Sequence, residues 1–104
     1  MWRGEIWWAN LQPPTGPRPV LLLSRDAAYR RRGSVTIAPI TTRVRGIPVE
    51  VPLGPEDGLP RQSVVNLDEI TTISMSALGR QVAMLSPEKM LRVDDAIKFA
   101  LDLG

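Results

Sequence analysis

Apolar and polar positions alternate along most of this chain in a way that is typical of short β-strands. Residues 5–11 combine an isoleucine with two adjacent tryptophans, and residues 34–42 are rich in β-branched residues, which favours a pleated sheet. Residues 19–24 form an almost continuous apolar run, which is typical of a buried strand. The same reasoning predicts strands at residues 49–51, 63–67 and 81–85, and extended chain over residues 68–73.

One segment, from residue 87 to about residue 103, has the signature of a long helix. Ser86 suits the N-cap and Pro87 the first helical position. Shorter helical turns are expected at residues 26–33 and 76–79. Several short strands followed by one terminal helix predict a mainly β protein, in which a small, strongly bent sheet or barrel carries a C-terminal α-helix. Apolar residues recur at helical spacing at Met90, Val93, Ile97, Ala100 and Leu101.

Prolines and glycines separate the predicted strands. Residues 12–17 hold three prolines and a glycine and are expected to form a loop. Pro39, late in the strand at residues 34–42, predicts an edge position or a bulge because proline cannot donate to the sheet. We see no internal repeat, linker or low-complexity segment, and we therefore expect one domain over residues 1–104.

Composition narrows the chemistry that is open to this chain. The sequence has 104 residues, no cysteine and no histidine, and a formal net charge of +2. These absences exclude disulfides, thiolate metal sites and histidine acid–base catalysis. Residues 1–45 hold eight arginines and two acids, whereas residues 46–104 hold five basic and nine acidic residues. An arginine-rich, basic half favours a phosphate-bearing partner.

Neither a targeting segment nor a membrane span is expected. The first residues lack the apolar stretch of a signal peptide, and no apolar run approaches the roughly 20 residues that a span needs. We therefore expect a cytoplasmic protein. The acidic pairs at residues 68–69 and 94–95 predict no metal site, because adjacent side chains point in different directions.

Arg18 is the best charged candidate for a functional site. It lies between Pro17 and Pro19, whose fixed φ angles stiffen the turn before the strand at residues 19–24. A guanidinium on a rigid turn suits a phosphate or a carboxylate. The alternative is a surface arginine in a loop.

Thr41 and Thr42 place two hydroxyl groups at the end of a strand. RNA carries its own nucleophile, the 2′-hydroxyl, which must be oriented in line with the phosphate. An arginine and a threonine can assist its cleavage by neutralising charge in the transition state. The residues alone predict a phosphate-binding small β domain, with single-stranded RNA as a candidate substrate. The three arginines at 30–32 contact phosphate or form a solvated face.

Several short motifs stand in a fixed order from residue 3 to residue 103. They are residues 3–7 (RGEIW), 16–21 (GPRPVL), 38–42 (APITT), 57–58 (DG) followed by 63–65 (SVV), 68–73 (DEITTI), 78–79 (LG) and the terminal helix. Together these motifs resemble the MazF/PemK toxin family. The resemblance implies an SH3-like, partly open β-barrel of the CcdB/PemK type, with a C-terminal helix, that works as a homodimer.

The activity that this resemblance implies is that of a sequence-specific endoribonuclease toxin of a type II toxin–antitoxin pair. Such enzymes need no metal or other cofactor and cut single-stranded RNA through the 2′-hydroxyl, which leaves 2′,3′-cyclic phosphate and 5′-hydroxyl ends. They inhibit growth until an antitoxin, here MazE-like, covers the RNA groove, and an extended segment with acidic and apolar residues is the expected inhibitor of a basic cleft.

The resemblance also implies the site residues. Arg18 matches the family's catalytic arginine and Thr41 its catalytic threonine. Many members carry a longer loop before the arginine, with a glutamate that has no counterpart here, since Gly16 is followed at once by Pro17. The residues expected to flank bound RNA are Pro14, Thr15, Thr42, Arg43, Arg45, Asp68 and Glu69.

Two other functions remain as alternatives. A CcdB-like gyrase poison shares this fold, but the C-terminal Trp-Gly-Ile-type tip of those toxins is absent from the ending Ala-Leu-Asp-Leu-Gly. A non-catalytic SH3-like binding module is the second alternative.

Overall fold

The structure is a computed structural model that describes residues 2–25 and 33–104, and in these residues it has seven strands and one long helix. The predicted mainly β, partly open barrel with a C-terminal helix is confirmed. Most of the helical turn predicted at residues 26–33 lies outside the described residues. The elements are β1 (Glu5–Ala9), β2 (Arg18–Leu22), β3 (Ser34–Thr41), β4 (Glu50–Leu53), β5 (Ser63–Asn66), β6 (Thr71–Ser74), β7 (Leu78–Met84), α2 (Pro87–Ala100) and the 3₁₀ turns η2 (Pro55–Asp57), η3 (Leu67–Glu69) and η4 (Met75–Ala77).

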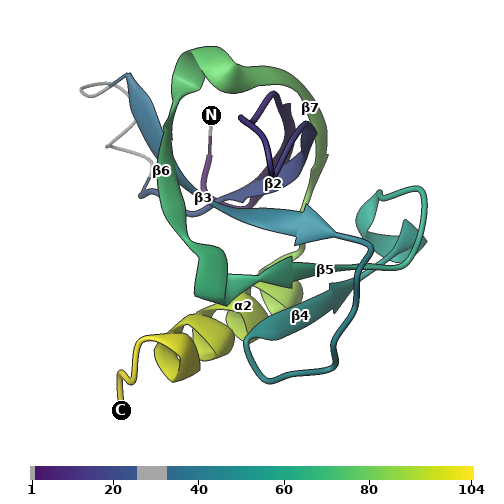
Figure 1. Cartoon of the computed structure of the whole chain (residues 1–104). Coiled ribbons are helices and arrows are strands. Elements are labelled where there is room, and N and C mark those ends of the chain that lie inside the picture. Colours follow the sequence, from purple (N-terminus) through teal and green to yellow (C-terminus); the bar gives the residue numbers. More distant parts are fainter. Residues whose placement is uncertain (1, 26–32) are drawn as a thin grey trace.

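β3 connects two parts of one antiparallel sheet. The strand order is β4-β5-β3-β2-β1-β7, and β6 also pairs with β3. One edge of β3 pairs with β2, while the other edge pairs with β6 at residues 34–37 and with β5 at residues 40–41. Figure 1 shows the resulting ring of bent strands, with the β4–β5 hairpin and α2 below it. One strand therefore supports both the barrel and the hairpin.

The edge position predicted for Pro39 is wrong for the strand as a whole, because β3 is central. Pro39 lies opposite Val20 of β2. On its other side, Ala38 and Pro39 fall in the interval between the residues that pair with β6 and those that pair with β5. Since proline has no N–H to donate, this interval is where a central strand can accommodate one.

Most element boundaries differ from the predicted ones by one to three residues. β1 ends at Ala9 rather than at residue 11, and β7 begins at Leu78 rather than at residue 81. The N–H of Asn10, just after β1, donates a hydrogen bond to the carbonyl of Ala77, just before β7. The extended chain predicted at residues 68–73 begins instead as η3, because the Asn66 side chain accepts a hydrogen bond from the Asp68 N–H at 2.9 Å. Such local side-chain bonds compete with strand pairing. The helix predicted to residue 103 ends at Ala100.

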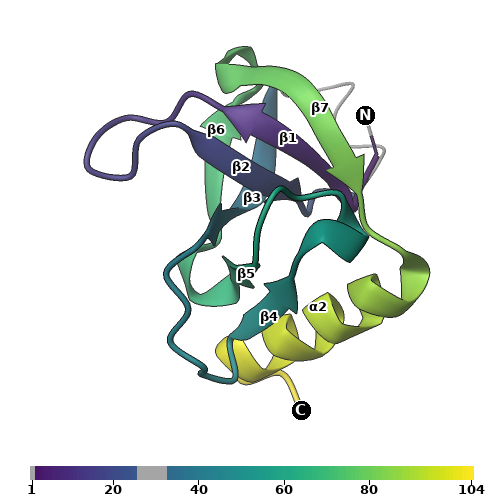
Figure 2. The ribbon, with the colours of Figure 1, turned by 90° about the vertical axis from the view of Figure 1, so that its right-hand side faces the viewer.

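The buried residues form two clusters on opposite faces of β2. The first cluster includes Leu21 and packs beneath α2, where Val93 and Ala96 are buried. The second cluster includes Val20 and Leu22 and fills the inside of the bent sheet. Since successive residues of a strand point to opposite faces, β2 contributes to both clusters. Figure 2 shows α2 lying along the β4 side of the sheet, away from β1.

α2 is capped and tied to the sheet by polar contacts. The Ser86 hydroxyl accepts a hydrogen bond from the Lys89 N–H at 3.1 Å, as predicted for an N-cap. The Lys89 ammonium forms an ion pair with Asp57 of η2 at 3.2 Å. Arg3 forms a second ion pair with Asp94 at 2.6 Å. Among the described residues, no helix has the length and apolarity that a bilayer crossing requires.

Candidate functional site

The structure brings Arg18 and Thr41 to the same end of neighbouring strands. Arg18 begins β2 and Thr41 ends β3. The antiparallel register pairs Val20 with Pro39. Two residues back along β2 and two residues forward along β3, the same register sets Arg18 opposite Thr41.

Both side chains belong to the face that carries the second cluster. Val20 and Leu22 lie in that cluster, and Arg18 shares their face because side chains alternate along a strand. Ile37 also lies in the cluster, and Thr41, four residues along β3, shares its face. The arginine and the threonine therefore stand side by side at the open end of the bent sheet.

The turn before β2 fixes the guanidinium of Arg18. Its Nη2 donates to the main-chain carbonyl of Thr15. Gly16 adopts a φ of 72°, in the left-handed region that favours glycine, and its N–H closes the turn on the Gln12 carbonyl at 3.1 Å. The predicted rigid turn is therefore held by main-chain contacts that position Arg18.

The Nε of Arg18 is buried, and it has no hydrogen-bond partner within the described residues. Leaving a buried donor unsatisfied costs roughly 1–3 kcal/mol, and more when the group is charged. An acceptor from outside the chain can reach this donor once the atoms that cover it move aside. A phosphate oxygen satisfies both the charge and the hydrogen bond of a guanidinium.

The Thr41 hydroxyl accepts a hydrogen bond from the Arg43 N–H at 3.1 Å. This contact uses a lone pair of the oxygen and leaves the O–H free to donate. Arg18 and Thr41 thus present two donors at the same strand ends. Such a pair can stabilise negative charge that develops on a phosphate during its reaction.

A cleft of about 490 Å³ opens on the same face of the sheet and includes Thr15. Neither Arg18 nor Thr41 is among the lining residues, but the lining includes Thr15, whose carbonyl accepts a hydrogen bond from Arg18. Glu69, at the end of η3, also borders the cleft and is exposed. The cleft is lined by Leu11, Gln12, Thr15, Ile37, Pro39, Glu69, Ile70, Thr71 and Ile73.

The basic loop between β3 and β4 leaves the sheet beside Thr41. Thr42, Arg43 and Arg45 are exposed in this loop. The Glu50 carboxylate accepts hydrogen bonds from the N–H groups of Arg45 and Gly46 at 3.0 and 2.9 Å. Figure 2 shows this loop and the β1–β2 loop on the same side of the sheet.

The predicted site residues therefore divide into two groups. Pro14, Thr15, Thr42 and Arg43 flank Arg18 and Thr41 along the chain, and Glu69 joins them across the cleft. The other two predicted residues are less directly placed. The Arg45 main chain is tied to Glu50, and the exposed Asp68 is absent from the cleft lining.

Sequence reasoning missed most of the cleft, including the polar residues Gln12 and Thr71. Its lining comes from the β1–β2 loop, from β3 and from the η3–β6 segment. Part of the lining lies in the motifs at residues 38–42 and 68–73, but these motifs do not by themselves mark a cleft, because β3–β6 pairing and the turn before β2 bring the lining together.

Comparisons with known proteins agree on one group of relatives. A sequence model described as "PemK-like, MazF-like toxin of type II toxin-antitoxin system" matches residues 2–101. The chain is 41% identical over 101 residues to "Probable endoribonuclease MazF5" of Mycobacterium tuberculosis (strain ATCC 25618 / H37Rv), covering 96% of this chain and 92% of the relative.

Solved structures extend this similarity to the fold. "Mycobacterium tuberculosis toxin MazF-mt6" is 40% identical, with a TM-score of 0.89 that covers 96% of this chain and 98% of the other. "Endoribonuclease in complex with its cognate antitoxin from Mycobacterial species" is 31% identical, with a TM-score of 0.87 and coverage of 100% and 97%.

Proposed function

We propose that this chain, which belongs to the PemK-like, MazF-like toxins of type II toxin–antitoxin systems, is a sequence-specific, metal-independent endoribonuclease that cleaves single-stranded RNA. The observation that carries the mechanism is the unpartnered, buried Nε of Arg18 beside the Thr41 hydroxyl. The relatives are named endoribonucleases, which favours this activity over a CcdB-like gyrase poison or a non-catalytic SH3-like module.

In the proposed reaction, the RNA 2′-oxygen attacks the adjacent phosphorus. The O2′–P bond forms and the P–O5′ bond breaks, while the 2′-hydroxyl loses its proton to solvent water and the leaving 5′-oxygen takes a proton from solvent water. Arg18 donates to a non-bridging phosphate oxygen and neutralises the charge that grows in the transition state. The Thr41 hydroxyl donates a hydrogen bond to the same phosphate. The products are a 2′,3′-cyclic phosphate and a 5′-hydroxyl.

The test is cleavage of single-stranded RNA in EDTA, with both new ends mapped. Arg18→Ala should lower kcat by roughly 10²–10³-fold, the usual loss when one donor to a developing oxyanion is removed. Thr41→Val removes the hydroxyl at nearly constant shape and should also lower kcat. Arg80→Ala is a matched control, because Arg80 is exposed on β7 at the far edge of the sheet. Wild-type protein that cuts no RNA, or full activity of Arg18→Ala, would contradict the proposal.

We propose further that the chain acts as one domain in the cytoplasm, where it inhibits translation and growth until a MazE-like antitoxin neutralises it. One solved relative is described as an endoribonuclease in complex with its cognate antitoxin, and it covers all of this chain. Co-expression of the neighbouring gene product should restore growth and block RNA cleavage by purified protein. A neighbouring product that neither binds nor inhibits the chain would contradict this pairing.

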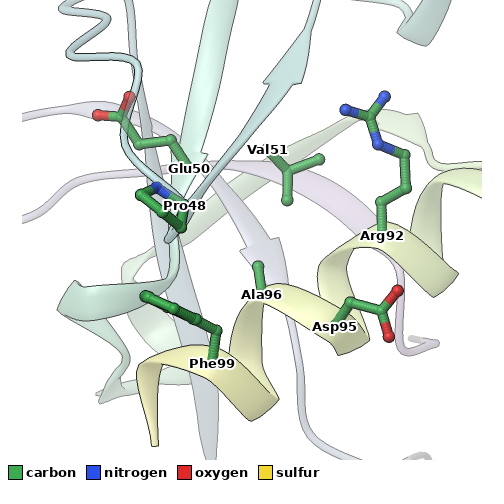
Figure 3. Close-up of a pocket in the computed structure, with 7 residues that line it drawn as sticks. All are labelled: Pro48, Glu50, Val51, Arg92, Asp95, Ala96 and Phe99. Atoms are coloured by element: carbon green, nitrogen blue, oxygen red, sulfur yellow. The ribbon is translucent and has the colours of Figure 1, made fainter.

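A homodimer is supported by exposed apolar side chains on α2 and the basic loop. Leu91 and Phe99 of α2 are 65% and 62% exposed, and Val44 of the loop is 55% exposed. A pocket of about 350 Å³ lies between α2 and the start of β4, and Figure 3 shows Phe99 at one end of it and Arg92 at the other. Covering such a surface removes apolar area from water.

Sedimentation of the purified chain should therefore give twice the monomer mass. Phe99→Glu should shift it toward monomer, because a carboxylate would then have to enter the apolar contact. A monomeric wild-type protein would contradict the dimer.

A further inference from the structure

The cleft beside Arg18 combines an apolar floor with a polar rim, which is typical of a small-molecule site. We propose that it binds one nucleobase of the RNA next to the scissile phosphate, and that Glu69 selects a base that carries an amino group on its pairing edge. This inference rests on the proposed endoribonuclease function. The floor consists of Leu11, Ile37, Pro39 and Ile73, and the rim of Gln12, Thr15, Glu69 and Thr71.

The position of the cleft fixes which part of the substrate reaches it. Thr15, in the β1–β2 loop, lines the cleft, and its main-chain carbonyl accepts a hydrogen bond from the guanidinium of Arg18. A phosphate bound to Arg18 therefore places an adjacent nucleotide at the cleft mouth. The bases of single-stranded RNA are free to splay out from the backbone into such a pocket.

The floor suits the flat face of a base. Ile37 and Pro39 are buried residues of β3, and Leu11 and Ile73 are half-buried residues on either side of them. Ile37 belongs to the second cluster, and Leu11 and Ile73 pack against that cluster. Pro39 lies in the central strand β3. The floor is therefore built on regular structure, which fixes its shape before RNA arrives.

The rim supplies side-chain hydrogen-bonding groups that the part of the chain described by the structure does not use. In the described residues, the side chains of Gln12, Glu69 and Thr71 make no hydrogen bond or ion pair, although neighbouring Thr72 is bonded to Thr36 at 3.0 Å. The volume of about 490 Å³ is within the range of about 300–1,000 Å³ of small-molecule sites. Free polar groups around an apolar floor supply orientation and specificity.

Glu69 determines which base forms the most favourable hydrogen bonds in the cleft. An ionised carboxylate only accepts hydrogen bonds. Adenine and cytosine present an amino group on the pairing edge, and guanine presents an amino group beside a ring N–H. Uracil presents one ring N–H between two carbonyl oxygens, which repel a carboxylate. The cleft should therefore discriminate against uracil at one position beside the cut.

The experiment is cleavage of an RNA pool with a randomised segment, followed by sequencing of the new ends. Wild-type protein should disfavour uracil at one position next to the cut, roughly tenfold or more, as one good base contact supplies. Glu69→Gln should reduce that discrimination by a similar factor, because an amide also donates to carbonyl oxygens. Glu56→Gln removes the same charge from the exposed η2 turn, away from the cleft, and should leave the preference unchanged.

A second variant tests the cleft itself. Thr71→Phe fills the mouth of the cleft with a residue that suits a strand. On a preferred substrate it should raise KM about tenfold or more and change kcat less, because it blocks base binding and leaves Arg18 and Thr41 in place. Circular dichroism checks that the variant is folded.

The outcomes separate the two proposals. If wild-type protein cuts no RNA, the proposed function fails first. If wild-type protein cuts RNA and Glu69→Gln shows the wild-type base preference at every position, the role of Glu69 is overturned. Thr71→Phe with wild-type KM would overturn base binding in the cleft.

Discussion

Glu50 anchors the basic loop, and its replacement should show how much that loop depends on one carboxylate. Glu50 is 9% exposed at the start of β4. One of its oxygens, Oε1, accepts both the Arg45 and the Gly46 N–H. Glu50→Ala removes both acceptors at once, whereas Glu50→Gln keeps an uncharged oxygen in nearly the same place.

The expected loss follows from these two contacts. A hydrogen bond to a charged group contributes about 1.5–3 kcal/mol. Arg45 and Gly46 are exposed, so their freed N–H groups bind water, and removing Glu50 also removes the cost of burying a carboxylate. We therefore expect Glu50→Ala to lower the free energy of unfolding by about 2 kcal/mol, and Glu50→Gln by about half of that. For a domain of this size, 2 kcal/mol lowers Tm by roughly 8–16 °C.

Urea denaturation, monitored by tryptophan fluorescence, measures this loss of stability. Binding of an uncleavable RNA then measures the effect on the loop, which carries Arg43 and Arg45. At a temperature where both variants are folded, Glu50→Ala should bind more weakly than Glu50→Gln, because a loosened loop must be reordered on binding. The reasoning is refuted if Glu50→Ala is as stable as Glu50→Gln, or if both bind RNA as the wild-type protein does.

Three further substitutions test the packing of α2 and of the η2 turn by chemical denaturation. Lys89→Met leaves the mostly buried Asp57 carboxylate without its ion pair and should cost about 3 kcal/mol; an unchanged midpoint would contradict this. Gly58→Ala should cost more than about 1 kcal/mol, since Gly58 has a φ of 89° and an added Cβ would lie 2.8 Å from the Ala83 Cβ; a more stable variant would be the contrary result. Ser86→Ala removes the acceptor of the Lys89 N–H at 3.1 Å and should lower the free energy of unfolding by about 1 kcal/mol. Equal denaturation midpoints for the variant and the wild-type protein would show that the cap contributes nothing.

Strands and the helix were predictable from the sequence because each has a local cause. The start of α2 follows from Ser86 and Pro87, and the buried strand β2 follows from its apolar run. The prediction of an edge position or a bulge at Pro39 was wrong in placing the whole strand at an edge, because it used one property of one residue, the missing N–H. The chain satisfies that property with an interval between β6 and β5, two strands that are distant in the sequence from β3.

The candidate site was predictable to the same extent. Arg18 and Thr41 each stand at a strand end that the sequence marks, and the strand register brings them together. The cleft and the role of Glu50 were not predictable, because both depend on contacts between separate segments. Glu50 looks like any polar residue of a short strand until the loop folds back onto its carboxylate.

The pairing of β1 with β7 sets the order in which the chain can fold during synthesis. β1 pairs with β2 on one edge and with β7, from near the other end of the chain, on its second edge. The ribosome therefore makes Arg18 and Thr41 before it makes β7, the strand that completes this edge of the sheet. Pairings between distant residues form slowly, because their loops cost entropy to close. A nascent chain thus carries both residues of the site before β7 is available to complete the sheet beneath them.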